Sequence, residues 1–220
     1  MTEPTPVLDA RKAPIDDILE AAARVIFSGG VIIFPTDTVY GIGCDPFEIA
    51  AIERIFAAKG RDAGKPLTFH LGTVVEYLEY TKGHQLGEYV GKRLLPGPVT
   101  LILPKPEWVN PVITGGMRTL GFRIPDDALS CAILDRCGPL ATTSANESGR
   151  PAYRGEGDRE PLPAVDLFIE SGPTRYRRES SVLDLTTDPP RLLREGVLSY
   201  EDLTAKLALD IIPTFRESAR

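Results

Sequence analysis

The chain has 220 residues, of which 42% are hydrophobic and 25% charged, a composition typical of a globular protein with one sizeable core. Its formal net charge of −6 at pH 7 argues against a protein that binds nucleic acid through bulk positive charge. Three cysteines without CxxC spacing, only two histidines and a polar, acidic N-terminus predict a cytoplasmic protein with reduced thiols and without structural zinc, signal peptide or membrane span.

Helical and strand patterns alternate along the chain. In chain order, we expect a helix at 15–26, a strand at 31–34, a helix at 49–58, a strand at 67–71, helices at 74–80 and 85–95, strands at 99–103 and 119–125, a helix at 128–137, strands at 140–143 and 165–170, a hairpin at 181–185 and 191–194, and a last helix ending near 209. The sequence therefore predicts one α/β domain, a twisted open mixed sheet flanked by helices, at residues 11–209, with terminal extensions at 1–10 and 210–220.

A cationic cluster, KGRDAGKPLTFH (Lys59–His70), lies between the second helix and the next strand. Its glycines and lysine resemble a P-loop, but only three residues separate the glycines, and a proline stands where that motif needs Ser or Thr. Two interpretations remain open. The cluster is either a solvated helix end, where cations complement the helix dipole, or an anion-binding site.

Two polar segments come directly after predicted strands. PTDTVYGIG (Pro35–Gly43) follows the first strand, and the run from Ser144 to Gly149 follows the strand at 140–143. Each is either a capped turn or a loop that lines a ligand site at the strand end. Arg123 lies near the end of an otherwise apolar strand, so it needs a carboxylate from the protein or from a ligand.

A second basic segment, SGPTRYRRES (Ser171–Ser180), precedes the hairpin. Solvation is the simplest interpretation of its three arginines, Arg175, Arg177 and Arg178. The stretch 147–163 is the most polar and the richest in glycine and proline, which predicts a surface loop.

Polar residues that are poor core material gather mostly at the ends of the predicted strands. They are Thr38, Arg61, Lys65, His70, Arg123, Ser144, Asn146, Ser180 and Arg194. The chain has no GxSxG elbow, no cysteine–histidine motif and no motif with paired acids, which argues against covalent or two-carboxylate hydrolysis. Many donors with few bases favour chemistry on phosphates, driven by positioning and charge neutralisation.

Seven segments in order resemble the YrdC/Sua5 family over roughly residues 15–199. They are PTDTVYGIG (Pro35–Gly43), KGR with KPLTFH (Lys59–His70), PGPVTLIL (Pro96–Leu103), GFRIP (Gly121–Pro125), TSANESGRPA (Thr143–Ala152), ESSVLDLT (Glu179–Thr186) and LREG (Leu193–Gly196). The resemblance implies a YrdC-like fold and a threonylcarbamoyl-AMP synthase, which makes threonylcarbamoyl-adenylate and pyrophosphate from L-threonine, bicarbonate and ATP. It also implies a downstream tRNA threonylcarbamoyl transferase as partner, and a weak contact with tRNA.

The resemblance also assigns roles to residues of this chain. It implies that Lys59 and Arg61, with Ser144 and Asn146, are the catalytic pairs. ATP is expected at Arg61, Lys65, Thr119, Asn146 and Arg194, and threonine at Thr38, His70, Arg123, Ser144 and Ser180. We expect no organic cofactor and no protein ligand to a metal, since Mg²⁺ arrives with the nucleotide.

Two other functions remain as alternatives. One is a module of the same fold that binds structured RNA such as tRNA or double-stranded RNA, which the acidic composition disfavours. The other is a relative that forms carbamoyl-adenylate rather than threonylcarbamoyl-adenylate. Dependence of the reaction on threonine distinguishes the three.

Overall fold

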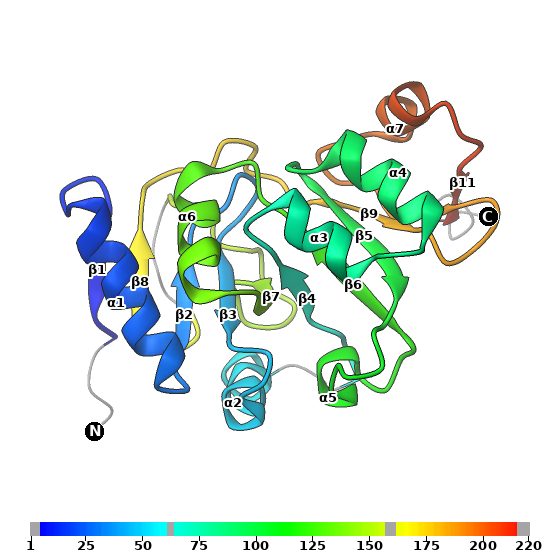
Figure 1. The fold of residues 1–220 in the computed structure, drawn as a ribbon. Coiled ribbons are helices and arrows are strands. Elements are labelled where there is room, and N and C mark those ends of the chain that lie inside the picture. The colour runs from blue at the N-terminus through cyan, green and yellow to red at the C-terminus, as the bar shows by residue number, and fades with distance from the viewer. Residues whose placement is uncertain (1–4, 61–63, 157–161, 215–220) are drawn as a thin grey trace.

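The computed structural model describes residues 5–60, 64–156 and 162–214 (Figure 1). The strands are β1 (Val7–Asp9), β2 (Val31–Phe34), β3 (Gly41–Cys44), β4 (Thr68–His70), β5 (Val99–Pro104), β6 (Thr119–Arg123), β7 (Leu140–Ser144), β8 (Leu167–Glu170), β9 (Ser181–Asp184), β10 (Arg191–Arg194) and β11 (Ile212–Pro213). The helices are α1 (Ile15–Phe27), α2 (Ile49–Lys59), α3 (Val74–Tyr80), α4 (Gln85–Leu94), α5 (Pro111–Thr114), α6 (Ala128–Cys137) and α7 (Tyr200–Leu207).

All the described strands join one sheet in the order β1-β8-β2-β3-β7-β4-β6-β5-β9-β10-β11. The sheet contains both parallel pairs, such as β4–β6 and β5–β9, and antiparallel pairs, such as β3–β7 and β9–β10. The predicted fold class, an open mixed sheet flanked by helices, is therefore confirmed. Edge strands β1 and β11 extend the sheet past residues 11–209 at both ends.

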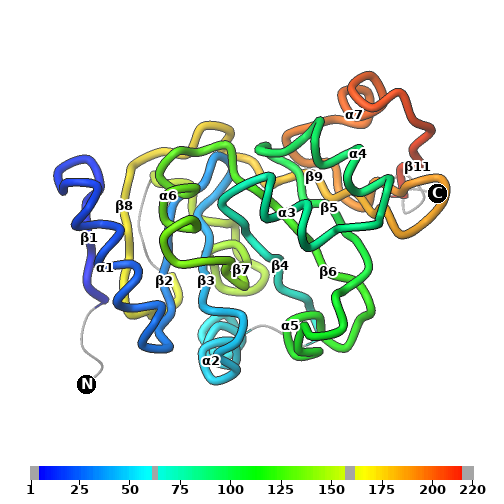
Figure 2. The backbone as a smooth tube through the Cα atoms, viewed as in Figure 1, coloured from blue at the N-terminus to red at the C-terminus, as the bar shows by residue number. Residues whose placement is uncertain are grey.

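The sheet brings together segments that are far apart in the sequence. β7 lies between β3 and β4, so the residues before the Ser144–Gly149 run stand beside both the PTDTVYGIG segment and the end of the cationic cluster. The tube in Figure 2 shows how the chain returns to the middle of the sheet to place β7 there. Three of the polar segments singled out in the sequence thus meet at the centre of the molecule.

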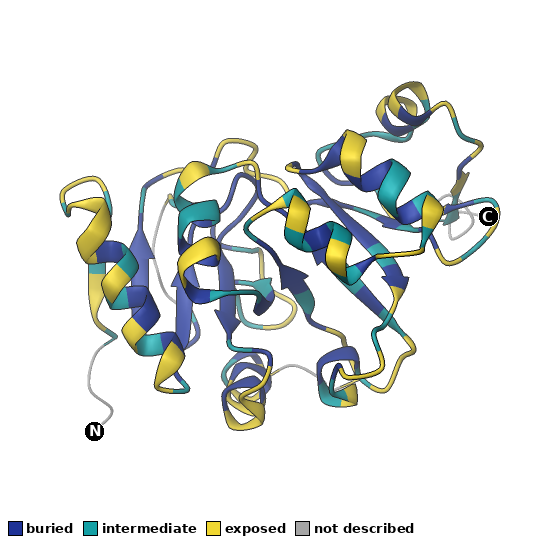
Figure 3. Cartoon of the chain, in the orientation of Figure 1, coloured by how far each residue is buried: buried dark blue, intermediate teal, exposed yellow. Residues whose placement is uncertain are grey.

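Two hydrophobic clusters hold the layers together. α1 and α6 lie side by side over β2 and β8 (Figure 1), and they pack with Ile32 and Phe34 of β2, while Val31 and Ile33 belong to the second cluster. This division follows from the alternation of side chains along a strand. Figure 3 shows the buried strands and the exposed outer surfaces of α1 and α6. None of the described helices has the length and apolar character needed to cross a membrane.

Four elements were missing from the sequence prediction: β1, β3, α5 and β11. β3 begins inside PTDTVYGIG, the segment expected to be a loop, and α5 lies in a proline-rich stretch. β3 has the sequence GIGC and lacks a strand pattern, because its glycines serve close packing. A Cβ on Gly41 would lie 3.0 Å from Cγ2 of Thr142 and 3.3 Å from Cε1 of Phe34. Tertiary contacts therefore override local propensity at this strand.

Candidate active site

A pocket of about 770 Å³ lies across one face of the sheet. Along β4, β5, β6 and β9, residues such as Phe69, Leu101, Phe122 and Leu183 belong to the hydrophobic core, while their neighbours line the pocket. The lining side chains include Thr68, His70, Thr100, Thr119, Arg123, Ser180 and Asp184. The volume lies within the range of about 300–1,000 Å³ that is usual for small-molecule sites.

Most of the site residues expected from the sequence line this one pocket. They are Lys59, Lys65, His70, Thr119, Arg123, Ser144, Asn146, Ser180 and Arg194. Arg61 lies outside the described residues. Thr38 is fully buried and does not line the pocket, whereas Thr36 does.

The Thr36 hydroxyl serves the backbone of the PTDT turn. Thr36 Oγ1 donates to the Val39 carbonyl at 2.6 Å and accepts from the Thr38 amide at 3.1 Å. Thr174 Oγ1 donates to the Thr38 carbonyl at 2.7 Å, which ties the second basic segment to this turn. Thr36 therefore caps this turn and also reaches the pocket, while Thr38 Oγ1 lies 3.1 Å from Thr36 Oγ1.

Several residues that line the pocket were not predicted, because the candidate residues in the sequence were taken mostly from the ends of predicted strands. Thr68, Thr100 and Thr142 lie within strands β4, β5 and β7, and their side chains face the pocket. Residues two positions apart on a strand lie on the same face of the sheet. Two polar residues at that spacing, such as Thr68 and His70, therefore indicate a polar face that could have been predicted. The pocket covers a face of the sheet and not only its edge.

Lys59 holds the Ser144–Gly149 run in place. Its side chain is 2% exposed, and Nζ donates to the Ser144 carbonyl, to the Asn146 carbonyl at 2.6 Å and to Asn146 Oδ1 at 3.1 Å. Ser144 Oγ donates to the same Asn146 oxygen at 2.6 Å, and the Ser148 amide donates to the Lys59 carbonyl at 2.8 Å. The lysine therefore orders the loop that forms this wall of the pocket, in addition to supplying positive charge.

A buried ion pair forms the floor of the pocket. Arg123 Nη2 pairs with Asp37 Oδ1, and the two side chains are 5% and 0% exposed. Burial raises the pKa of Asp37, while the Arg123 cation opposes that rise. Three buried polar atoms of this floor have no hydrogen-bond partner among the described residues: Asp37 Oδ2, Arg123 Nε and His70 Nδ1. Such atoms are costly unless a ligand or water completes them.

His70 is a neutral side chain at physiological pH. Burial, together with the neighbouring Arg123 cation, lowers the pKa of His70 from 6.5 to about 3. A neutral imidazole offers one N–H donor and one acceptor nitrogen to the pocket, where an imidazolium would offer two donors. It can therefore accept a hydrogen bond from a ligand ammonium or hydroxyl.

The pKa of His70 predicts a specific dependence of stability on pH. Because the folded-state pKa of about 3 lies below the unfolded value of 6.5, the unfolded chain binds the extra proton first. His70 should thus destabilise the fold increasingly as the pH falls from about 6.5 towards 3, and should have no effect on the slope above about 7. Urea unfolding of wild type and His70→Asn between pH 7 and pH 5 measures this. The variant should lose less stability over the interval, and parallel curves would contradict the assignment.

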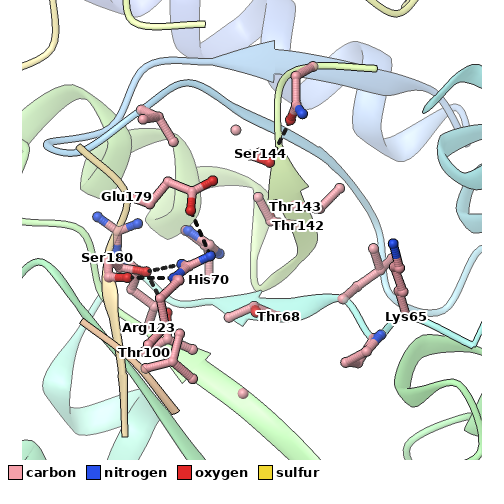
Figure 4. Close-up of a pocket in the computed structure, with 18 of the residues that line it drawn as sticks. Lys65, Thr68, His70, Thr100, Arg123, Thr142, Thr143, Ser144, Glu179 and Ser180 are labelled. Atoms are coloured by element: carbon pink, nitrogen blue, oxygen red, sulfur yellow. Dashed lines mark hydrogen bonds and ion pairs between the residues drawn. The ribbon is translucent and has the colours of Figure 1, made fainter. Parts of the chain in front are cut away.

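A second corner of the pocket is formed by the start of β9 and the end of β10. Ser180 Oγ lies 3.0 Å from Thr100 Oγ1 and accepts from Arg194 Nη2 at 3.2 Å. Arg194 also donates from Nε to the Ser180 carbonyl at 3.0 Å and pairs with Glu179 at 2.9 Å. Figure 4 shows this corner beside His70 and Arg123, with Lys65 on the opposite side of the pocket.

The described residues contain no group of three or more His, Cys, Asp and Glu side chains that could hold a metal ion. Glu179 and Asp184 are carboxylates in the pocket wall, and Glu179 is already paired with Arg194. These acids fit a metal ion only if a ligand brings most of its coordination sphere. A magnesium–nucleotide complex, in which phosphate and water oxygens surround the ion, satisfies that condition.

Comparison with known proteins adds an independent line of evidence. The model of the Sua5/YciO/YrdC family, described as telomere recombination, matches residues 24–196. A threonylcarbamoyl-AMP synthase of Pyrococcus abyssi is 37% identical over 204 residues, which cover 90% of this chain and 60% of the relative. One of Bacillus subtilis is 35% identical over 195 residues, covering 86% and 56%. The chain thus spans less than two thirds of the length of these two curated relatives.

A solved structure supports the same relationship. The crystal structure of P. abyssi Sua5 complexed with L-threonine superposes with a TM-score of 0.83 at 35% identity, covering 95% of this chain and 62% of that chain. The match therefore includes nearly all of the sheet and the pocket that lies on it.

Proposed function

The chain belongs to the Sua5/YciO/YrdC family, and we propose that it catalyses the synthesis of threonylcarbamoyl-AMP from L-threonine, bicarbonate and ATP. The observation that carries the proposal is the composition of the pocket. One end holds a buried arginine with an unsatisfied N–H beside a neutral histidine, and lysine and arginine side chains line the rest. An amino acid and a polyphosphate need these two environments side by side.

Threonine is proposed to bind over the buried ion pair. Arg123 has an unsatisfied Nε beside the Nη2 that donates to Asp37, so its guanidinium can still donate to a carboxylate oxygen of the substrate. The unpartnered nitrogen of His70 and the hydroxyl of Ser180 then meet the polar groups of the amino acid. A substrate that completes these buried groups is favoured over one that leaves them unpaired.

ATP is proposed to lie along the remaining wall, with its phosphates near Lys65 and Arg194 and its other polar groups near Thr119 and Asn146. Magnesium is proposed to enter with the nucleotide, where it offsets phosphate charge. Arg61 is part of the same proposal from the sequence alone. No side chain needs to act as a nucleophile.

The reaction balances with these three substrates. The threonine amine and bicarbonate give N-carboxy-threonine and water. An oxygen of that carbamate attacks the α-phosphorus of ATP, the bond to the β-phosphate oxygen breaks, and pyrophosphate leaves. The pocket contributes by aligning the two substrates and by stabilising charge on the phosphates, which is the usual source of catalysis in phosphoryl and nucleotidyl transfer.

The product is an activated acyl group, and a separate enzyme must consume it. We propose a tRNA threonylcarbamoyl transferase as that partner, with at most a weak contact between this chain and tRNA. A cytoplasmic location is part of the same proposal and is supported by the three free thiols of Cys44, Cys131 and Cys137.

Release of pyrophosphate tests the proposal. Purified protein with ATP, magnesium and bicarbonate should release pyrophosphate only when L-threonine is added. Equal release without threonine would contradict the proposal, and release that depends on an added carbamoyl donor instead of threonine would favour the carbamoyl-adenylate alternative. No release, combined with tRNA binding that survives Lys59→Ala, would favour the RNA-binding alternative.

A further inference from the structure

A smaller cavity of about 290 Å³ adjoins the main pocket, and none of the proposed substrates occupies it. The charged residues of its walls are Arg150, Arg154, Arg178, Arg194, Glu179 and Glu195. Four arginines against two glutamates leave an excess of positive charge in a protein whose formal net charge is −6. A local cationic concavity on an acidic protein attracts anions.

The second basic segment divides its arginines between two roles. Arg175 pairs with Asp126 at 2.6 Å and Arg177 with Glu156 at 2.7 Å, and both lie outside the cavity. Arg178 lines the cavity, and its side chain donates to the Glu195 carbonyl at 3.4 Å, its only hydrogen bond with the described residues. Two of the three arginines thus form ordinary surface ion pairs, while the guanidinium of Arg178 contributes positive charge to the cavity wall.

Arg154 is the second cation available there. Its side chain forms no hydrogen bond or ion pair with the described residues, and its backbone carbonyl accepts from the Thr174 amide at 2.9 Å, which ties it to the same segment. The glutamates are already engaged, since Glu179 pairs with Arg194, and Glu195 Oε2 accepts from the Tyr200 amide at 3.2 Å. Arg154 and Arg178 therefore face the cavity without a carboxylate partner among the described residues.

The cavity communicates with the main pocket. Val39, Arg150, Glu179 and Arg194 line both, so an anion in the smaller cavity lies next to the guanidinium of Arg194 that we place near the ATP phosphates. The volume of about 290 Å³ is just below the usual range for small-molecule sites, so it suits a small anion better than a nucleotide.

We propose that this cavity binds inorganic pyrophosphate, the leaving group of the adenylation. The identity of the anion rests on the proposed function, whereas the site rests on volume and charge. Several arginines around a small space favour a compact ligand with several charges and many acceptor oxygens, because guanidinium groups pair with phosphate oxygens two at a time. Bicarbonate has a single charge and cannot engage more than one of them in this way.

Calorimetric titration of the chain with sodium pyrophosphate, at a fixed ionic strength and without ATP or threonine, tests the site. The double variant Arg154→Gln/Arg178→Gln should weaken pyrophosphate binding at least about tenfold, since each charge-assisted hydrogen bond is worth that much. The matched control, Arg175→Gln/Arg177→Gln, removes the same amount of positive charge at arginines that lie outside the cavity, and it should bind like wild type.

Two results would overturn the proposal: wild-type affinity in the Arg154→Gln/Arg178→Gln variant, or equal weakening in the control, which would mean bulk electrostatics only. Titrations with bicarbonate and with inorganic phosphate form the other arms, and displacement of pyrophosphate by millimolar bicarbonate would assign the cavity to that substrate instead. Because the titration needs no turnover, it separates failure of this site from failure of the proposed reaction. A chain that binds pyrophosphate through these arginines but shows no threonine-dependent release would retain the site and lose the reaction.

Discussion

Replacing Arg123 by alanine is expected to lower the free energy of unfolding by about 3–5 kcal/mol and to abolish threonine-dependent pyrophosphate release. The variant leaves Asp37 buried without its counterion, and it removes the group proposed to hold the substrate carboxylate. Urea unfolding measures the first effect and the pyrophosphate assay the second. Arg118→Ala, at an exposed arginine just before β6, should stay within about 0.5 kcal/mol of wild type.

Two further variants separate the structural and the binding role of Arg123. In Asp37→Asn/Arg123→Ala no carboxylate is left unpaired, so the double variant should be more stable than Arg123→Ala but equally inactive. Arg123→Lys keeps the charge and loses the planar fork, so the threonine KM should rise roughly tenfold to a hundredfold. An unchanged threonine KM in Arg123→Lys would remove Arg123 from the substrate site.

Replacing Lys59 by methionine is expected to lower turnover by about a hundredfold or more, because the buried ammonium orders the Ser144–Gly149 run. The substitution keeps most of the volume of the side chain and leaves the carbonyls of Ser144 and Asn146 without that donor. Each buried acceptor left unpaired costs about 1–3 kcal/mol, so the loop should loosen and the nucleotide KM should rise.

Lys59→Arg distinguishes order from charge. The guanidinium keeps the positive charge, but it is planar and larger than the ammonium. It would have to fit into the space of Lys59, a residue that is only 2% exposed. If Lys59 acts by ordering the loop, Lys59→Arg should be almost as impaired as Lys59→Met, and Lys92→Met, at an exposed lysine of α4, should behave like wild type. Full activity of Lys59→Arg would show that positive charge alone suffices.

The sequence predicted the elements that carry a regular pattern and missed those shaped by contacts. Helix α6 and strand β2 were predicted with their observed bounds, because each is an apolar pattern that ends at turn or capping residues. β3 could not be predicted, since its glycines are selected by the approach of Thr142 and the Phe34 ring from other strands. Local patterns report burial along one element, whereas packing between strands depends on residues distant in the chain.

Most residues of the candidate site could be named from the sequence, but the contacts between them could not. A buried arginine must have a carboxylate, so a partner for Arg123 was required by the sequence, but that the partner is Asp37 follows only from the fold. Lys59 was expected in a catalytic pair with Arg61, and the structure shows its ammonium bound to the carbonyls of Ser144 and Asn146. Side chains that serve the backbone of another segment are indistinguishable in sequence from side chains that serve a ligand.

The most direct test of the proposed activity is the fate of the bicarbonate carbon. The purified chain is incubated with ATP, magnesium, L-threonine and ¹³C-bicarbonate, and the nucleotide products are identified by mass spectrometry. The wild-type chain should yield a threonylcarbamoyl-AMP that carries the ¹³C label, and this product should be missing with Arg123→Ala. An unlabelled threonyl-AMP, or the absence of any new adenylate, would contradict the proposed reaction.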